Sequence, residues 1–527
     1  MSRLTRMQTG LSPHGRNRRQ WNSIALTTAF ALGLSGCTVG PDFVPPAPPQ
    51  VKRYTATETP TVLTAGEGET VQQLVTGKAI SAQWWELYRS PQLNQVLLQA
   101  INASPTLSAA KATLAQSQQV LRQVQGGYYP QLDVNAAAQR QRSSGLAGTP
   151  TTTSNLYSLG AVVSYAPDVF GGTQRQVEQA AALAENQRYQ LAAAYLTLTG
   201  SAVTQAITIA SIRQQIGAVQ DIITEDERNL RLVKLKFDAG KAARSDVLAA
   251  ESQLANDRAQ LPPLKQLLSK ARHALAVLVG KFPGMWSAPD FELTEFVLPT
   301  ELPVSVPSAL VRQRPDILAA EAQLHASSAA IGVATSQLYP NITLSGSIGT
   351  QALSTSNLFQ ASNQFWNLVA SLTAPIFHGG ALDAQKQAAI YAFQASAASY
   401  QQTVLTAFGQ VADVLRALTY DAELIAAQKN ALDISIASLT LQRLSYAAGK
   451  SDLIQLLDAE RAYQQARLGY SRARAQRYLD SALLFVAMGG GWWHANDPVA
   501  PVGAASGTSQ QSTVNGSVEA KRKPQSP

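Results

Sequence analysis

The stretch LAAAYLTLTGSAVTQAITIASIRQQIGAVQDIITEDERNLRLVKLKFDAG, residues 191–240, decides the fold class of this 527-residue chain. Its seam residues recur at alternating intervals of four and three, the heptad pattern of helices that pack along one face. They are Leu191, Tyr195, Leu198, Ala202, Gln205, Ile209, Ile212, Ile216, Val219, Ile223, Asp226, Leu230, Val233 and Phe237. Because no proline lies between Thr173 and Phe237, we predict one helix of about 65 residues, roughly 97 Å long at 1.5 Å per residue.

This helix is expected to return on itself. Phe237-Asp-Ala-Gly240-Lys241 ends it, and a second helix over about 243–279 follows. The stretch 381–446 also lacks proline, and Tyr446-Ala-Ala-Gly449-Lys450 precedes a helical pattern over about 452–487. Gly240 and Gly449 are predicted turn residues with positive φ. The sequence therefore predicts two long helical hairpins.

The two hairpins belong to two similar halves of the chain. Pro105 and Tyr129-Pro130 match Pro315 and Tyr339-Pro340 at an offset of 210, and the two tip motifs match at an offset of 209. Several landmarks in one order indicate a tandem duplication of about 200 residues.

Each half also contains two segments of alternating polarity. The clearest is Ile342-Thr-Leu344-Ser-Gly346-Ser-Ile348, whose period of two is typical of a strand. We expect strands over about 130–140, 155–167, 340–350 and 364–376, and a fold that is mainly α with a small β part. Such strands fit an outer-membrane barrel. Because four strands are too few to close one and open edges do not survive in lipid, several copies of the chain would have to share it; three copies would give twelve strands.

The first residues predict an exported, lipid-bearing protein. An Arg-rich start and the apolar stretch Ile24–Leu34 lead into Leu34-Ser35-Gly36-Cys37. This reads as a lipoprotein signal peptide, residues 1–36, with a covalent lipid on Cys37, the only cysteine. The alternative is an incidental cysteine behind a longer signal.

The remaining boundaries follow from composition. We expect a Pro-rich, lipid-anchored tether (37–80), a first repeat (81–279), a connector (280–310), a second repeat (311–488) and a disordered tail (489–527).

Several motifs resemble the TolC-like outer-membrane efflux protein family, and most closely its lipoprotein (NodT-like) branch. They are Gly36-Cys37-Thr38-Val39-Gly40-Pro41-Asp42-Phe43, Trp84-Trp85 with Ser90-Pro91-Gln92-Leu93, Arg314-Pro315-Asp316-Ile317 with Ala320-Glu321, and Tyr446-Ala-Ala-Gly449 with Leu456-Leu457-Asp458-Ala459. The resemblance implies a homotrimer with a β-barrel in the outer membrane and a helical barrel in the periplasm. It also implies an efflux duct that is closed at rest and is opened by a periplasmic adaptor and an inner-membrane RND-type transporter.

The resemblance also implies roles for residues near the hairpin tips. Asp458 occupies the main position of an acidic selectivity gate, and Gln455 stands where a second carboxylate is expected. A tip latch would involve Asp246, Tyr446, Lys450 and Ser451. Two other interpretations remain open: Asp458 is a solvated surface charge, and Asp246 caps the returning helix.

Other classes of protein are disfavoured. The formal net charge of +8 includes Arg3, Arg6, Arg16, Arg18 and Arg19 of the predicted signal, and no basic readout motif for nucleic acid occurs in the body. The histidines have no zinc-site spacing, and the pair Glu321 and His325 is typical of a surface contact. We expect no enzyme activity, no metal and no cofactor besides the lipid. A coiled-coil scaffold lipoprotein without transport activity is the alternative function. No apolar run reaches the ~18–20 residues of a membrane-spanning helix.

Overall fold

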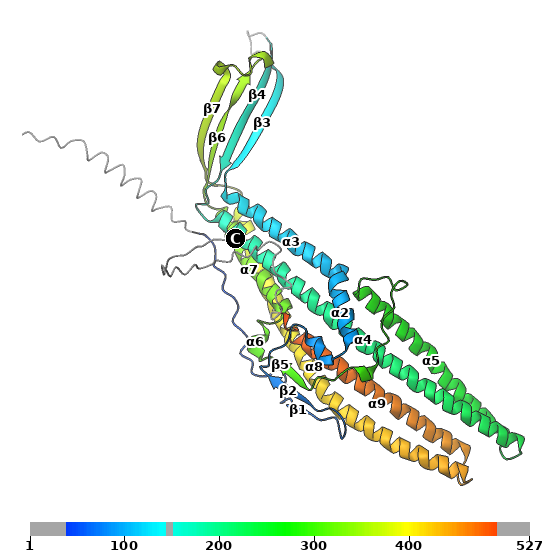
Figure 1. Ribbon diagram of the computed structural model, residues 1–527. Helices are drawn as coiled ribbons and strands as arrows, with labels where there is room; N and C mark the ends of the chain where they lie inside the picture. The colour runs from blue at the N-terminus through cyan, green and yellow to red at the C-terminus, as the bar shows by residue number, and fades with distance from the viewer. Residues whose placement is uncertain (1–37, 144–150, 493–527) are drawn as a thin grey trace, which may run out of the picture.

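The structure, a computed structural model, describes residues 38–143 and 151–492. Figure 1 shows an elongated molecule with a curved sheet at one end and long helices that run away from it. The predicted signal peptide, Cys37 and residues 493–527 of the predicted tail lie outside the described residues.

Two helical hairpins make up most of the length. The first consists of α4 (Gly172–Asp238) and α5 (Arg244–Leu278), and the second of α8 (Ala381–Ala447) and α9 (Leu453–Ala487). The predicted bounds of α4 and α8 were 173–237 and 381–446, so the heptad pattern and the lack of proline located both helices to within a residue. One irregularity distinguishes the hairpins: α5 contains Pro262 and Pro263 in its interior.

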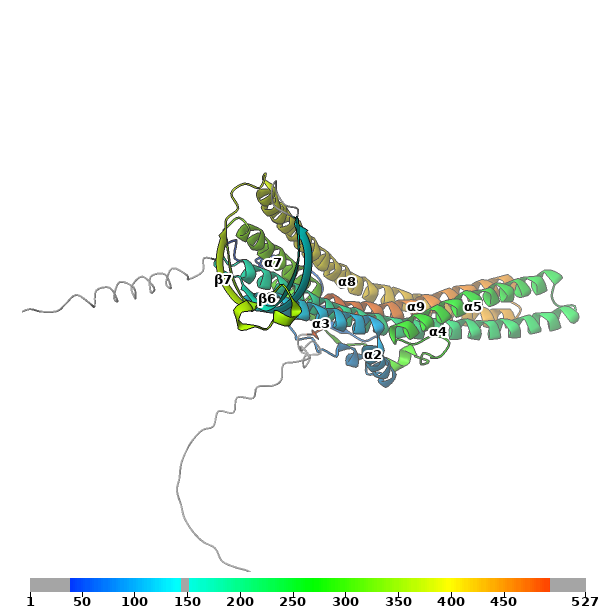
Figure 2. The ribbon, with the colours of Figure 1, turned by 90° about the horizontal axis from the view of Figure 1, so that it is seen from above.

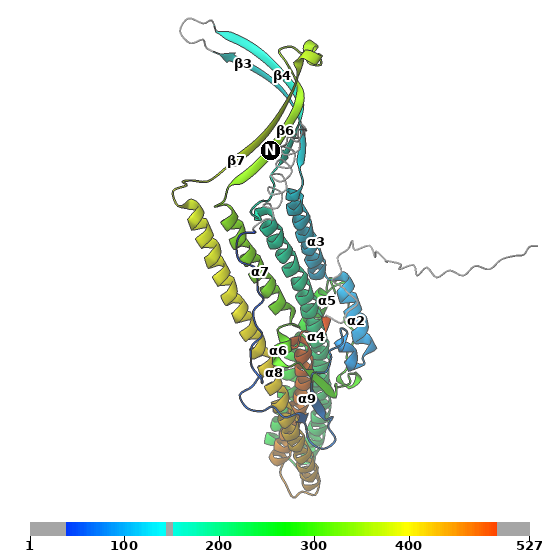
Figure 3. The same cartoon turned by 90° about the vertical axis from the view of Figure 1, so that its left-hand side faces the viewer.

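Shorter helices lead into the sheet. They are α2 (Pro91–Ala103), α3 (Pro105–Gln125), α6 (Pro307–Leu310) and α7 (Pro315–Ser336). Each begins with proline, whose missing N–H is one of the donors that a first helical turn leaves unpaired. Figure 3 shows α3, α4, α7 and α8 in a row below the strands, and neighbours in this row are in contact.

The large sheet joins the two repeats. β3 (Gln131–Ser143) and β4 (Thr152–Tyr165) come from the first repeat, and β6 (Asn341–Ala352) and β7 (Gln364–Thr373) from the second. All pairs are antiparallel in the order β3-β4-β6-β7, and the sheet forms an arc when seen from above (Figure 2). Gly160 faces Gly349 where the repeats meet, and a Cβ on Gly349 would lie 2.7 Å from the Gly160 Cα. This close approach requires glycine.

The predicted tether (37–80) contains two short strands after its Pro-rich stretch. β1 (Val62–Leu63) and β2 (Gln72–Thr76) form a small sheet with β5 (Glu301–Val304) of the predicted connector. Gln72 is fully buried, its Nε2 donates to the Pro299 carbonyl (2.8 Å), and its Oε1 accepts from Arg477 Nε (2.8 Å). These partners are more than 200 residues away in sequence, so no local pattern could indicate them.

The predicted tail also begins later than expected. Gly489, Gly490 and Gly491 are buried, and Trp492 Nε1 donates to the Gln313 carbonyl (2.8 Å). Residues 489–492 therefore belong to the folded body.

The main core lies midway along the molecule. Trp84 and Trp85, on a short 3-10 helix (Trp84–Tyr88), are buried there, and the Trp84 ring stacks on Phe485 with centroids 5.2 Å apart. Among the described residues, no helix combines the length and the apolar character needed to cross a membrane.

Candidate functional site

The predicted gate and latch residues lie at the hairpin ends farthest from the sheet (Figure 1). Gly240 (φ 68°) and Gly449 (φ 69°) follow the ends of α4 and α8. The next N–H in each turn donates back into the helix, from Lys241 to the Lys236 carbonyl (2.7 Å) and from Lys450 to the Ser445 carbonyl (2.8 Å). A glycine with positive φ, followed by a residue whose N–H bonds back to the carbonyl five residues earlier, is the Schellman motif that ends helices. The two tips therefore have the same local geometry.

A small apolar cluster packs the two tips together. It contains Val233 of α4, Val247 of α5, Leu439 of α8 and Leu456 of α9. Tyr446 packs against this cluster, and Lys236 Nζ lies 3.8 Å from the centre of its ring. This cation–π contact links α4 to α8, and at a solvated site it contributes about 0.5–1 kcal/mol.

Asp246 lies in the first turn of α5. Its Oδ2 accepts a hydrogen bond from the Ala243 N–H (2.9 Å), which satisfies a donor that the helix start leaves open. Within the described chain no ion pair or hydrogen bond joins Asp246 to Tyr446, Lys450 or Ser451. The hydroxyl of Ser451 is buried without a hydrogen-bond partner. Within a single chain, neither hydrogen bonds nor ion pairs among the described residues therefore join Asp246 to the other three predicted latch residues.

Asp458 and Gln455 lie on the exposed face of α9, one turn apart, while Leu456 and Leu457 are buried. The Asp458 side chain is 60% exposed, and its Oδ1 accepts from Arg461 Nη1 at 2.9 Å. Sequence reasoning did not assign Arg461, although a spacing of three on a helix could have indicated it. The pair partly neutralises the predicted gate charge.

Three buried carboxyl groups lie in the seam between the hairpins. Asp226 of α4 and Glu460 of α9 are 4% and 3% exposed, and Asp257 of α5 is 2% exposed. Burial, and then the hydrogen bond with Asp257, raise the pKa of Asp226 to about 8. Burial also raises the pKa of Glu460, although Asn229 Nδ2 donates to it (2.6 Å) and Arg443 lies 3.5 Å away.

Asp257 has more hydrogen-bond donors around it than Asp226. Asp257 accepts from Gln253 Nε2 and Gln260 Nε2, each at 2.7 Å, and from Gln464 Nε2 at 3.3 Å. No N–H or hydroxyl group donates to the buried Asp226 Oδ2, and the hydrogen bond of the Asp226 carboxyl is with Asp257. With a pKa of about 8, Asp226 is the carboxyl that holds a proton at neutral pH. The only hint of this cluster in the sequence was Asp226, one of two polar residues, with Gln205, in the heptad seam.

The cluster borders an open groove of about 470 Å³ between α4, α8 and α9. Asp226 and Glu460 line its inner side, and Asp221, Arg443 and Arg467 line its walls. Asp221 and Arg467 form an exposed ion pair (2.5 Å). No group of three or more histidine, cysteine or acidic residues in the described ranges could hold a metal ion.

Comparison with known proteins identifies the family. The model of the outer membrane efflux protein family matches residues 96–281 and 306–490, one segment for each repeat. The chain belongs to the outer membrane efflux protein family. It is 30% identical over 417 residues to the pyoverdine export outer membrane protein OpmQ of Pseudomonas aeruginosa, covering 78% of this chain and 87% of OpmQ. It is 27% identical to the probable outer membrane lipoprotein SilC of Salmonella typhimurium, covering 78% and 88%.

A solved structure agrees with this assignment. The outer-membrane channel OprN superimposes with a TM-score of 0.79 at 27% identity, covering 86% of this chain and all of OprN. This outer membrane efflux protein is thus an outer-membrane channel, the exit duct of an efflux system, with a sheet for the outer membrane and helices that extend into the periplasm. The family is one of channel proteins, which excludes the scaffold alternative.

Proposed function

We propose that three copies of this chain form one duct with a shared twelve-stranded barrel, which a periplasmic adaptor and an inner-membrane RND-type transporter open. The observation that carries this proposal is the open sheet: each chain supplies four strands, and β3 and β7 end it as unpaired edges among the described residues. Unpaired edges are not tolerated in lipid. Native mass measurement in mild detergent tests the assembly, and monomers or dimers as the stable species would refute it.

We propose that Cys37 carries the lipid anchor. The lipobox supports this proposal, as does the similarity to SilC, whose name describes a lipoprotein. Mass spectrometry of the mature protein should find residue 37 at the amino terminus with acyl chains. An unmodified Cys37 would exclude the anchor.

We propose that Asp458 sets ion selectivity at the tip. Its exposure on α9 supports this role, because three such carboxylates around an axis attract cations. In planar bilayers, Asp458→Ala should reduce the preference for cations, and Arg461→Ala should increase it by freeing the carboxylate. Asp433→Ala is the control, since Asp433 is equally exposed on α8 and also pairs with a cation, Lys429 (3.3 Å). Equal selectivity in all three variants and the wild type would remove the gate assignment.

We propose that the contact between Tyr446 and Lys236 is the tip latch within each chain, while Asp246 caps α5. The 3.8 Å contact between α4 and α8 supports this assignment. Lys236→Met keeps the aliphatic length but loses the charge, so it should raise the open probability in bilayers. Lys234→Met is the control, because Lys234 pairs instead with Glu251 of the same hairpin (2.8 Å). Indistinguishable open probabilities of Lys236→Met and Lys234→Met would exclude this latch.

A further inference from the structure

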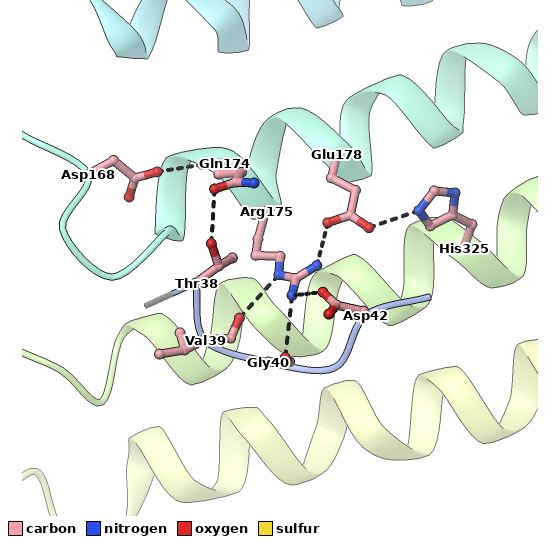
Figure 4. Close-up of polar contacts among 9 residues, drawn as sticks. All are labelled: Thr38, Val39, Gly40, Asp42, Asp168, Gln174, Arg175, Glu178 and His325. Carbon is pink, nitrogen blue, oxygen red and sulfur yellow. Dashed lines mark hydrogen bonds and ion pairs between the residues drawn. The ribbon is translucent and has the colours of Figure 1, made fainter. Parts of the chain in front are cut away.

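The residues that follow Cys37 lie along the start of α4 and beside α7 (Figure 4). We call Thr38–Phe43 the N-terminal strap. Thr38 Oγ1 donates to Gln174 Oε1 (3.1 Å), and the Val39 N–H donates to the Phe170 carbonyl (3.2 Å). At the other end of the strap, the Phe43 ring stacks on His325 with centroids 4.4 Å apart.

Arg175 of α4 is the centre of this contact. Its side chain is 4% exposed, yet each of its three nitrogens donates a hydrogen bond. Nε donates to the Val39 carbonyl (3.1 Å), and Nη2 donates to the Gly40 carbonyl (3.3 Å) and to Asp42 Oδ1 (2.7 Å). Nη1 donates to Glu178 Oε2 (2.7 Å). A planar guanidinium can make this set of bonds, whereas an ammonium cannot.

The network continues into the second repeat. Glu178 Oε1 lies 2.8 Å from Nε2 of His325, which belongs to α7. The sequence had paired His325 with Glu321, but Glu321 instead accepts from Arg312 (3.1 Å). The strap therefore contacts α4 of the first repeat and α7 of the second repeat at the same place.

Glycines provide the space for the strap. Gly40 has a φ of 95°, and a Cβ there would lie 2.4 Å from the Gly332 Cα of α7. A Cβ on Gly171 would lie 2.7 Å from Thr38 Cγ2, and one on Gly332 would lie 2.7 Å from Arg175 Cγ. A side chain at any of these positions would push the strap or Arg175 away. The three glycines therefore allow the backbone of the strap to lie directly against the backbone of α7 and the start of α4.

We propose that Arg175, with Gly171 and Gly332, is a receptor for the N-terminal strap, and that strap docking fixes the lipid anchor at the start of α4 while joining the two repeats. The anchoring part rests on the proposed lipid at Cys37. One peptide bond joins Cys37 to Thr38, so their Cα atoms are about 3.8 Å apart. The Pro-rich segment of the predicted tether follows the strap in sequence, so it adds no length between the lipid and the body.

If Arg175 had only a local role, it would stabilise α4 through its ion pair with Glu178, three residues later in the same helix. Arg188 and Glu185 form such a pair on the same helix, more exposed and at 3.4 Å. Arg188→Met is therefore the matched control for Arg175→Met.

Hydrogen exchange of the full-length protein in lipid nanodiscs tests the receptor. In Arg175→Met, exchange of the strap amides, including Val39, should rise by about tenfold or more, because several bonds to a charged group are lost. Arg175→Lys should give an intermediate rise, and Arg188→Met none. Gly40→Val should also expose the strap with every charge intact. Unchanged strap exchange in Arg175→Met and Gly40→Val, or a rise confined to α4, would overturn the proposal.

A second measurement separates the receptor from the lipid. Lys52 and Arg53 are exposed beyond the strap, so limited trypsin digestion can sever the strap from the chain that follows. The severed fragment should stay with the wild-type body on native gels and leave the body of Arg175→Met. A retained fragment without acyl chains would refute the lipid and keep the receptor, whereas an acylated fragment that leaves the wild-type body would refute the receptor and keep the lipid.

Discussion

The pair Asp226 and Asp257 makes the stability of the helical hairpins dependent on pH. The pKa of Asp226 is about 8 in the folded chain, against an ordinary value of 3.8. The folded chain therefore holds a proton that the unfolded chain releases between about pH 4 and pH 8. This contribution to stability is complete below pH 4 and is lost as the pH rises towards 8, with a slope of ~1.4 kcal/mol per pH unit for one proton.

Asp226→Asn removes this titration. The amide keeps the size of the protonated carboxyl and can donate to Asp257, without the cost of taking up a proton. At pH 7 that cost is at most ~4 kcal/mol, three pH units above the ordinary value. We therefore expect Asp226→Asn to be more stable than the wild type at pH 7 and 8, and nearly equal to it at pH 4.

Chemical denaturation followed by circular dichroism at several pH values measures this difference in the free energy of unfolding. Asp221→Asn is the control, because Asp221 lies on the same helix but is exposed and paired with Arg467. Burial raises the pKa of Asp421, beside Asp480, to about 8 as well, so a shallower slope should remain in Asp226→Asn. A slope equal to that of the wild type, or lower stability at pH 8, would refute the raised pKa of Asp226.

Three further predictions concern other parts of the molecule. Asp246→Ala should lower the free energy of unfolding by about 1 kcal/mol through loss of the cap, measured by denaturation, and should leave bilayer conductance unchanged; altered conductance would contradict a capping role. Ile348→Arg, near the middle of β6, should cost ~2–4 kcal/mol per chain in refolding into lipid, and Leu344→Arg, nearer the strand end, should cost less; the reverse order would contradict the sheet's placement. Cys37→Ala behind a conventional signal should still give trimers on native gels, because the barrel itself holds the chains together, and loss of trimers would show that the lipid is needed for assembly.

The long elements were predictable because their patterns are local and repeat many times. Over about 65 residues the heptad seam and the lack of proline leave few alternatives to one helix, and α4 and α8 differ from their predicted bounds by a residue. The four strands were found by alternation alone, although their ends shifted by up to three residues. The turns at Gly240 and Gly449 follow from one glycine each.

The features that sequence reasoning missed depend on contacts between distant residues. β1 and β2 are too short to show a pattern, and their partners lie far away in sequence: β2 pairs with β5, and Gln72 of β2 accepts a hydrogen bond from Arg477. Asp226 looked like a break in a seam, since nothing local indicates that Asp257 faces it. Nothing local explains the motif that contains Gly40 and Asp42, because its partner Arg175 lies about 135 residues away from Gly40.

The two return helices, α5 and α9, are equally long at 35 residues, but they are not equally stiff. Pro262 and Pro263 of α5 correspond to Ser471 and Arg472 of α9 at the repeat offset of 209. Each interior proline removes one backbone hydrogen bond and crowds the preceding turn. When the tips move, the first hairpin will therefore bend near Pro262 and Pro263, halfway along α5. The second hairpin will move as a rigid unit. Although the two hairpins come from similar halves of the chain, each chain thus contributes one more flexible and one more rigid hairpin to the channel wall.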